Sequence, residues 1–375
     1  MSTWRWDIFC AVVDNYGDIG VCLRLGRQLA REHGVQVRLW VDDLASYRKL
    51  AAGEARAPDG LTVHHWHADL PPDALADVVV AGFSCRLPGA YLDQMAARAP
   101  RPVWINLEYL SAESWVEGCH RLPSPHPRLP LVEHFFYPGF TARTGGLIRE
   151  AGLLAAQRAF RADGPAQARC WQLLQTPEPP AGALRVSMFT YESAAMAAQL
   201  EAWAAGSVPV WCGVPLGRAW RSVSAWLGCQ PAPGALIQRG QLSIAPLAFV
   251  AQDDYDRLLW SCDLNFVRGE DSFVRAQWAG RPLLWHIYPQ EEAAHRVKLA
   301  AFLDRYTAGL SAEAADALRA LHIGWNDGAL SADAWQRFEQ AMPALRAHAA
   351  QWCEALAGRE DLAAALVDFA KSELK

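Results

Sequence analysis

Short apolar runs alternate with amphipathic stretches through the first half of the chain. The apolar run 6–13 predicts a buried strand, and apolar residues at helical spacing predict a helix over 19–32 that ends at Gly34. Further strands are expected at 35–41, 61–66, 77–83 and 102–107. Strands that alternate with helices predict a parallel sheet with helices on both faces.

A second alternating pattern begins at Leu184. Its expected strands are 184–190, 208–211, 242–249, 263–267 and 282–287, with helices that include 254–261 and 272–279. After residue 291 the pattern is helical almost to the end. The proline-rich segment 176–182 predicts a linker, so we expect an N-terminal domain at 1–180 and a C-terminal domain at 183–358. Because open α/β sheets bind ligands at the carboxyl ends of their strands, two such domains predict a ligand site in a cleft between them.

The segment 108–140 interrupts the first alternation. It is rich in proline, histidine and aromatic residues. Long irregular segments in compact proteins are often functional loops. We therefore predict that this segment takes part in binding.

Composition restricts the class of protein. Of 375 residues, 52% are hydrophobic and 20% charged, with a net charge of −5, which favours a globular protein and argues against a nucleic-acid binder. The nine cysteines form no Cys-x-x-Cys pair, which is typical of free thiols in a reducing cytosol. The first residues do not resemble a signal peptide, and no apolar run is long enough to span a bilayer. We expect a cytoplasmic protein with no membrane or nucleic-acid partner.

A first candidate site follows the first predicted strand. Asp14 and Asp18 flank Gly17 there, at the edge of the sheet where ligands bind. The turn lacks the Gly-x-Gly-x-x-Gly spacing of dinucleotide-binding proteins. Two interpretations stay open: the acids act on a substrate, or Asp14 makes an Asx-turn and Asp18 caps the next helix.

A second candidate site is the turn from a predicted strand into a helix at 265–275. Backbone N–H groups at the start of this helix, together with the Ser272 hydroxyl, can hold a diphosphate. Arg268 can neutralise its charge, and Glu270 can accept hydrogen bonds from sugar or ribose hydroxyls. Alternatively, Asp271 or Ser272 simply caps the helix.

Two further strand ends carry groups suited to a nucleobase. Phe189 and Tyr191 follow one strand, and Phe249 and Gln252 follow another, so that aromatic rings can stack on a base and an amide can pair with it. The aromatic residues fit a protein core equally well. The segment 286–292 after the last strand either lines the same site or only turns the chain.

Two patterns suggest a metal at first. Asp254 and Asp256 match an Asp-x-Asp motif, and His64, His65 and His67 alternate near a strand. The two acids open a predicted helix, where the helix dipole favours them, and the histidines have no evident carboxylate or cysteine partners. We therefore predict that the protein holds no metal.

Six motifs together resemble the bacterial protein-arginine rhamnosyltransferases that modify translation elongation factor P. They occur in order along nearly the whole chain, at 13–21 (VDNYGDIGV), 108–113 (EYLSAE), 122–127 (LPSPHP), 189–192 (FTYE), 268–276 (RGEDSFVRA) and 285–290 (WHIYPQ). The resemblance implies a GT-B fold with two facing Rossmann-like domains and a helical C-terminal tail, whose helix at about 359–375 packs on the N-terminal domain. It also implies an inverting transfer of rhamnose from dTDP-β-L-rhamnose to an arginine of elongation factor P, which activates that factor, without a metal or other cofactor.

The resemblance also assigns roles to residues. Asp18 is the expected catalytic carboxylate, supported by Asp14, and Glu270 is the third residue expected in catalysis. The residues expected to bind dTDP-rhamnose are Asn15, Tyr16, Gly17, Phe189, Tyr191, Phe249, Gln252, Arg268, Glu270, Asp271 and Ser272. The segment 108–140 is the candidate for the side that receives the acceptor protein.

Three other functions remain alternatives at this point. A GT-B glycosyltransferase with a small-molecule or glycan acceptor would have the same fold and donor site. A nicotinamide-dependent oxidoreductase is disfavoured by the missing glycine motif. A sugar-binding protein without catalysis gives no reason for paired acids at the end of the first strand.

Overall fold

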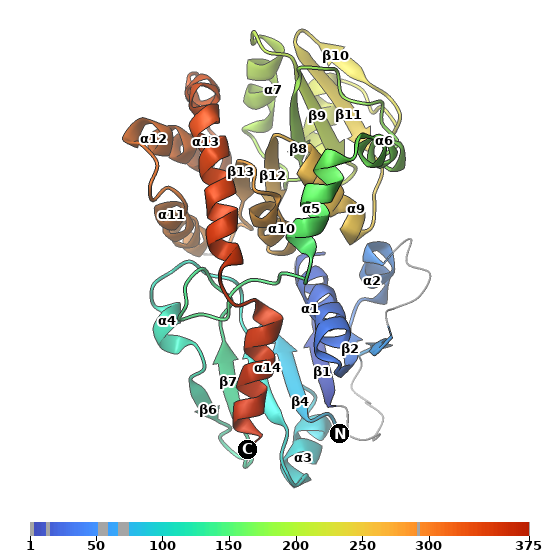
Figure 1. The fold of residues 1–375 in the computed structure, drawn as a ribbon, viewed down its shortest axis with the longest axis vertical. Helices are drawn as coiled ribbons and strands as arrows, with labels where there is room; N and C mark the ends of the chain where they lie inside the picture. The colour runs from blue at the N-terminus through green and yellow to red at the C-terminus, as the bar shows by residue number, and fades with distance from the viewer. Residues whose placement is uncertain (1–3, 13–15, 52–58, 67–74, 291–292, 375) are drawn as a thin grey trace. The chain divides into compact units, whose positions relative to one another are not determined.

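The chain folds into two α/β units, which Figure 1 shows in a computed structural model. The structure describes residues 4–12, 16–51, 59–66, 75–290 and 293–374. Unit 1 comprises Met1–Ala151 and Ala357–Lys375, and unit 2 comprises Gly152–Leu356.

Unit 1 is built on a sheet in which every strand pair but one is parallel, within the described ranges. Its strands are β1 (Arg5–Cys10), β2 (Gln36–Val41), β3 (Leu61–His65), β4 (Val78–Gly82), β5 (Val103–Leu107), β6 (Pro123–Pro125) and β7 (Val132–Phe136). They lie in the order β3-β2-β1-β4-β5-β7-β6, and only β6 and β7 are antiparallel. Strands β4 and β5 are buried along their whole length, because helices cover both faces of the sheet.

The helices of unit 1 come from both ends of the chain. They are α1 (Gly17–His33), α2 (Leu44–Leu50), α3 (Gly89–Ala97), α4 (Val116–Cys119) and α14 (Leu362–Glu373). Gly34 ends α1 in the left-handed conformation, at φ 63°. Helix α14 packs against α1, and Gln28 of α1 donates a hydrogen bond of 3.0 Å to Asp361, the residue that caps α14. The C-terminal helix therefore belongs to unit 1.

The segment 108–140 is not wholly irregular. It contains α4 and the antiparallel pair of β6 and β7, which extends the sheet of unit 1 beyond β5. The sequence does not reveal this pair, because β6 is only three residues long and has a proline at each end, which is typical of a loop; proline is tolerated in such a strand because β6 lies at the edge of the sheet.

Unit 2 has a second sheet, again parallel except at one edge of the part described. Its strands are β8 (Leu184–Met188), β9 (Val210–Pro215), β10 (Ile237–Arg239), β11 (Leu242–Leu247), β12 (Leu264–Arg268) and β13 (Leu283–His286), in the order β10-β11-β9-β8-β12-β13. Its helices are α5 (Leu153–Ala162), α6 (Gly164–Leu173), α7 (Met196–Ala204), α8 (Arg218–Leu227), α9 (Gln252–Ser261), α10 (Asp271–Ala279), α11 (Ala294–Tyr306), α12 (Ala312–Asn326) and α13 (Ala334–Ala357).

The boundary between the units differs from the one predicted at 180. Helices α5 and α6 belong to unit 2, because they pack against α9. Gln157 and Arg161 of α5 also bond to backbone carbonyls of unit 2, Arg161 to Trp260 at 3.3 Å and Gln157 to Trp278. The proline-rich segment 176–182 is a connection inside unit 2, between α6 and β8, and not a linker between units.

Both sheets share one connectivity. In the orders β3-β2-β1-β4-β5 and β11-β9-β8-β12-β13, the first strand of each unit, β1 or β8, lies in the middle. The strands that follow it in the chain lie on one side, and the last two strands lie on the other side, so the direction of strand order reverses at the first strand. Ligands of such sheets bind at the carboxyl ends of the strands beside this reversal, here β1 with β4 and β8 with β12.

Among the described helices, none combines the length and the apolar character needed to cross a lipid bilayer.

Candidate functional site

Asp18 lies in the first turn of α1, directly after β1. Its side chain is only 2% exposed, and its negative charge is one of the causes that raise the pKa of the Cys10 thiol, after the hydrogen bond with Cys22 and burial. The start of a helix stabilises a buried carboxylate through the helix dipole. Asp18 is not the N-cap of α1, because Tyr16 occupies that position. The capping alternative for Asp18 is therefore wrong.

The rest of this turn is only partly described. Asp14 and Asn15 lie outside the described residues. Tyr16 and Gly17 are half-buried and lead into α1 beside Asp18, at the reversal point of the unit 1 sheet.

The turn between β12 and α10 has the geometry of an anion site. Gly269 adopts φ 60°, a left-handed conformation that favours glycine, and Trp285 donates a hydrogen bond of 2.9 Å to its carbonyl. Glu270 is the N-cap of α10, and its side chain makes no capping hydrogen bond. The side chain of the N-cap residue therefore does not take up the N–H groups at the start of α10, where a helix favours an anion.

The Ser272 hydroxyl closes this turn on itself. It accepts a hydrogen bond of 3.1 Å from the backbone N–H of Arg268 and donates one to the carbonyl of the same residue. Ser272 is therefore not a capping residue of α10, and its first structural effect is to fix the backbone around Arg268.

Arg268 is held between aromatic rings. Its guanidinium carbon lies 4.7 Å from the ring centroids of both Phe189 and Tyr191, which follow β8. Cation–π contacts at this distance orient a guanidinium without neutralising it. The structure thus brings together the residues predicted at the ends of β8 and β12, at the reversal point of the unit 2 sheet.

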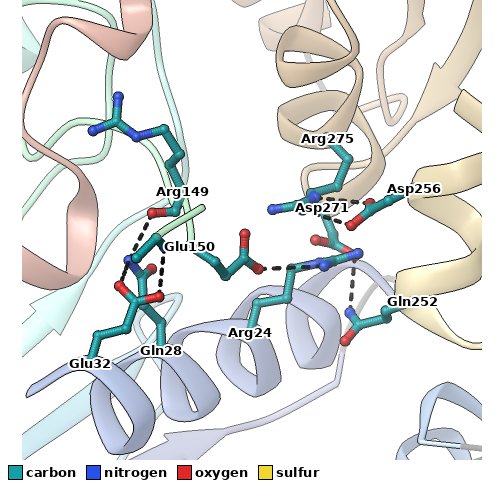
Figure 2. A network of polar contacts seen from close by, with 10 residues as sticks. Arg24, Gln28, Glu32, Arg149, Glu150, Gln252, Asp256, Asp271 and Arg275 are labelled. Atoms are coloured by element: carbon teal, nitrogen blue, oxygen red, sulfur yellow. Dashed lines mark hydrogen bonds and ion pairs between the residues drawn. The ribbon is translucent and has the colours of Figure 1, made fainter. Parts of the chain in front are cut away.

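The residues after β11 divide into an exposed ring and a buried amide. Phe249 is 42% exposed, as a ring that stacks on a base would be. Gln252, the first residue of α9, is buried and donates a hydrogen bond of 3.1 Å to the Asp271 carboxylate (Figure 2). Gln252 therefore joins the start of α9 to the start of α10, a role that the sequence did not predict for it.

His286 ends β13 next to these groups. It is 5% exposed, and its ring lies 5.2 Å from that of Tyr191, edge to face. Burial and, secondarily, the charge of Arg268 lower the pKa of His286 to about 4, so the imidazole is neutral at pH 7. His286, the first residue of the segment 286–292, therefore lies beside Tyr191 of the candidate site, while residues 291 and 292 lie outside the described residues.

The Asp-x-Asp motif lies in α9, and each of its two carboxylates forms an ion pair with an arginine. Arg275 of α10 binds Asp256 through two hydrogen bonds of 2.9 and 2.6 Å in a buried pair (Figure 2). Asp254 pairs with Arg257 on the same helix. Within the part of the chain described, no group of three or more His, Cys, Asp or Glu side chains is arranged to hold a metal ion.

One residue of this site was missed. Arg218 opens α8 after β9, and its guanidinium carbon lies 5.7 Å from the Tyr191 ring centroid. Strand β9 lies between β11 and β8, so its carboxyl end falls among the strand ends already described. An arginine at the start of an amphipathic helix gives no signal in the sequence, and only the strand order reveals its place.

Comparisons with known proteins agree on one family. The model of the family "Elongation-Factor P (EF-P) rhamnosyltransferase EarP" matches residues 6–371. A protein-arginine rhamnosyltransferase of Pseudomonas putida is 51% identical, over 98% of this chain and 99% of its own. One of Neisseria meningitidis is 37% identical, over 98% of this chain and 97% of its own.

Solved structures give the same result. A structure described as the basis for EarP-mediated arginine glycosylation of translation elongation factor EF-P matches with a TM-score of 0.71 and 38% identity, over 99% of both chains. MurG of Acinetobacter baumannii matches with a TM-score of 0.52 over 99% of this chain and all of its own; at 12% identity this shows the fold alone. The GT-B fold class predicted from the sequence is confirmed. With its two α/β units and this likeness over nearly its full length, the chain belongs to the EarP family of EF-P rhamnosyltransferases.

Proposed function

We propose that this protein transfers L-rhamnose from dTDP-β-L-rhamnose to an arginine side chain of elongation factor P, with inversion at the anomeric carbon, without a metal, and in the cytoplasm. The observation that carries the proposal is the arrangement of Arg268 over Phe189 and Tyr191 beside the first turn of α10. A cation, aromatic rings and helix N–H groups together fit a nucleoside diphosphate sugar.

The donor site divides by chemistry. Phe249 and Phe189 offer ring faces to the thymine base, and Tyr191 completes the aromatic wall. The N–H groups of the first turn of α10 and Arg268 bind the diphosphate. Ser272 holds the turn in shape, and Glu270 and Asp271 accept hydrogen bonds from ribose or sugar hydroxyls.

The acceptor nitrogen presents the main chemical difficulty. An arginine guanidinium has a pKa above about 12 and delocalised lone pairs, so it is a poor nucleophile. Asp18 first binds the guanidinium through charge-assisted hydrogen bonds, supported by Asp14, and Asn15, Tyr16 and Gly17 bind the donor. As the C–N bond forms, the nitrogen loses its proton to the Asp18 carboxylate, and dTDP leaves from the opposite face of the sugar.

A leaving group with a diphosphate gains negative charge as the glycosidic bond breaks. In the proposed mechanism this charge is stabilised by Arg268 and by the N–H groups that open α10, which are in place before the reaction. His286 stays neutral beside them and therefore adds a hydrogen-bonding group without a further charge.

The test is a reconstituted transfer reaction. The protein is incubated with dTDP-rhamnose and elongation factor P, and the acceptor is weighed intact by mass spectrometry. The expected product carries one deoxyhexose, located on an arginine by peptide fragmentation and absent when that arginine is replaced by lysine. Consumption of the donor with no sugar on the factor would instead support a small-molecule or glycan acceptor.

A further inference from the structure

Four arginines from separate parts of unit 2 gather at the amino-terminal edge of its sheet. This arginine cluster consists of Arg161 in α5, Arg185 in β8, Arg281 in the turn between α10 and β13, and Arg346 in α13. The candidate donor site lies at the carboxyl ends of the same strands, β8, β12 and β13. A strand of 5 residues separates the two edges by about 15 Å, so the cluster is not part of the donor site.

A single carboxylate, that of Asp263, pairs with members of the cluster. Asp263 directly precedes β12 and accepts hydrogen bonds of 3.1 and 3.4 Å from the side chain of Arg185. Its contact with Arg346 is longer, at 3.8 Å. Across the described ranges, no other acid forms an ion pair with any of the four arginines. Asp263 therefore has to balance more than one cation.

Two helix ends compensate Arg161. Its guanidinium donates a hydrogen bond of 3.3 Å to the carbonyl of Trp260, in the last turn of α9, and another to that of Ala279, the last residue of α10. Each helix end carries about half a negative charge, so together they offset one arginine. The three remaining arginines share one carboxylate, which leaves an excess of about two positive charges.

Arg281 has the least compensation of the four. Its guanidinium forms no hydrogen bond or ion pair with any described residue, and its Nε atom is buried. Burial lowers the pKa of Arg281, and the charges of Arg185 and Arg346 lower it further, against the opposite effect of Asp263. A buried N–H group is costly unless an acceptor reaches it. A negatively charged acceptor would satisfy this N–H group and the excess charge together.

We infer that the arginine cluster is a second anion-binding site, which takes a phosphate-bearing anion through Arg185, Arg281 and Arg346. The fork of N–H donors on a guanidinium matches phosphate oxygens, and an anion with two charges would cancel the excess. Such a ligand can enter from solvent, because the side chains of Arg185 and Arg346 are 32% and 44% exposed. The inference does not depend on the proposed function, since no residue of the donor or acceptor site takes part.

The test measures binding of inorganic pyrophosphate to the full chain by isothermal titration calorimetry at low salt. Arg268→Ala is the background, because it weakens the candidate donor site and leaves the cluster intact. In this background, Arg281→Gln and Arg346→Gln should each raise the Kd for pyrophosphate at least tenfold, and added salt should weaken binding. Arg337→Gln is the matched control. It removes the same charge from an exposed position of α13, roughly two and a half turns before Arg346, and should stay within about twofold of its background.

Urea unfolding separates anion binding from a structural role. Pyrophosphate should raise the midpoint of unit 2 in the unaltered protein and raise it less in Arg281→Gln, because only the folded cluster binds the anion. Without pyrophosphate, Arg281→Gln should not lower the midpoint, since it removes one of several like charges. A lower midpoint without pyrophosphate, combined with an unchanged Kd, would show that Arg281 is structural and would overturn the inference.

Two sources can supply the phosphate group, a free anion or a nucleotide. Adenosine diphosphate and pyrophosphate, compared in Arg268→Ala, distinguish them, because a site for nucleotides should bind adenosine diphosphate more tightly; either order of affinity supports the inference. Loss of all pyrophosphate binding in Arg268→Ala alone would mean that the anion binds in the donor site. That result, or equal affinities in Arg281→Gln, Arg346→Gln and Arg337→Gln, would overturn the inference and leave the proposed function standing.

Discussion

The buried pair of Asp256 and Arg275 ties α9 to α10, the two helices that begin with Gln252 and Asp271 of the candidate donor site. Its two hydrogen bonds, of 2.9 and 2.6 Å, use both carboxylate oxygens, and both side chains are almost wholly removed from water. Asp256→Ala would leave the Arg275 guanidinium in the interior without this carboxylate. Removing one partner of such a pair typically costs about 3–5 kcal/mol, a large part of the total stability of a domain.

The assay is urea unfolding, with hydrogen exchange of peptides from α9 and α10 to follow unit 2 specifically. For an m-value of about 3 kcal/mol/M, the expected loss lowers the midpoint of unit 2 by about 1–2 M. Asp254→Ala is the matched control, because it breaks a partly exposed pair with Arg257 on the same helix and should cost less than about 1 kcal/mol.

A double variant tests the cause. Asp256→Leu combined with Arg275→Met removes both charges and fills the space with apolar groups, so it should restore most of the lost stability. If Asp256→Ala shifted the midpoint no more than Asp254→Ala does, the pair would not hold the two helices together, and the reasoning would be refuted.

Four further predictions concern the site and its surroundings. Asp18→Asn should keep the Kd for dTDP within about twofold and slow rhamnosyl transfer by about 10²–10⁴, and near-normal turnover would contradict its role. Ser272→Ala removes two hydrogen bonds to the Arg268 backbone, and should weaken dTDP binding and lower the stability of unit 2 by about 1–3 kcal/mol; unchanged calorimetry on both counts would contradict this. Burial lowers the pKa of His322 from 6.5 to about 4. As the pH falls, the unfolded chain therefore binds a proton at this histidine before the folded protein does. About 3 kcal/mol of the stability present above pH 6.5 should be lost by pH 4. His322→Leu should remove that part of the acid sensitivity, as measured by urea midpoints across this pH range. EDTA should leave the transfer rate unchanged, and a rate restored by added Mg²⁺ or Mn²⁺ would disprove a metal-free reaction.

The helices and strands could be predicted because the spacing of apolar residues that specifies each one lies within its own segment of the sequence. The helix expected at 19–32 is α1 (Gly17–His33), and the helix expected at 272–279 is α10 (Asp271–Ala279). The domain boundary could not be predicted in this way. The proline-rich segment 176–182 has the composition of a linker, but the unit to which α5 and α6 belong depends on what their apolar faces contact, and that contact is with α9, far along the chain.

The candidate site was predictable where a side chain lies at or shortly after the end of a strand. Phe189 and Tyr191 follow β8, Arg268 is the last residue of β12, and the strand order brings them together at the reversal point. Arg218 was missed because a cation in the first turn of a helix is common on protein surfaces. The use of Gln252 as a bond to Asp271 was also missed, because it depends on two helix starts that only the sheet brings together.

Helix α14 has a consequence for how the chain folds during synthesis. Unit 2 is one continuous stretch, so it can fold as soon as its residues have left the ribosome. The core of unit 1 stays open until α14 emerges, because Leu366 and Phe369 complete it from beyond unit 2. A chain shortened before Asp361 would leave the apolar face of α1 uncovered and should be a target for chaperones and proteases, even though it retains every residue assigned to the reaction.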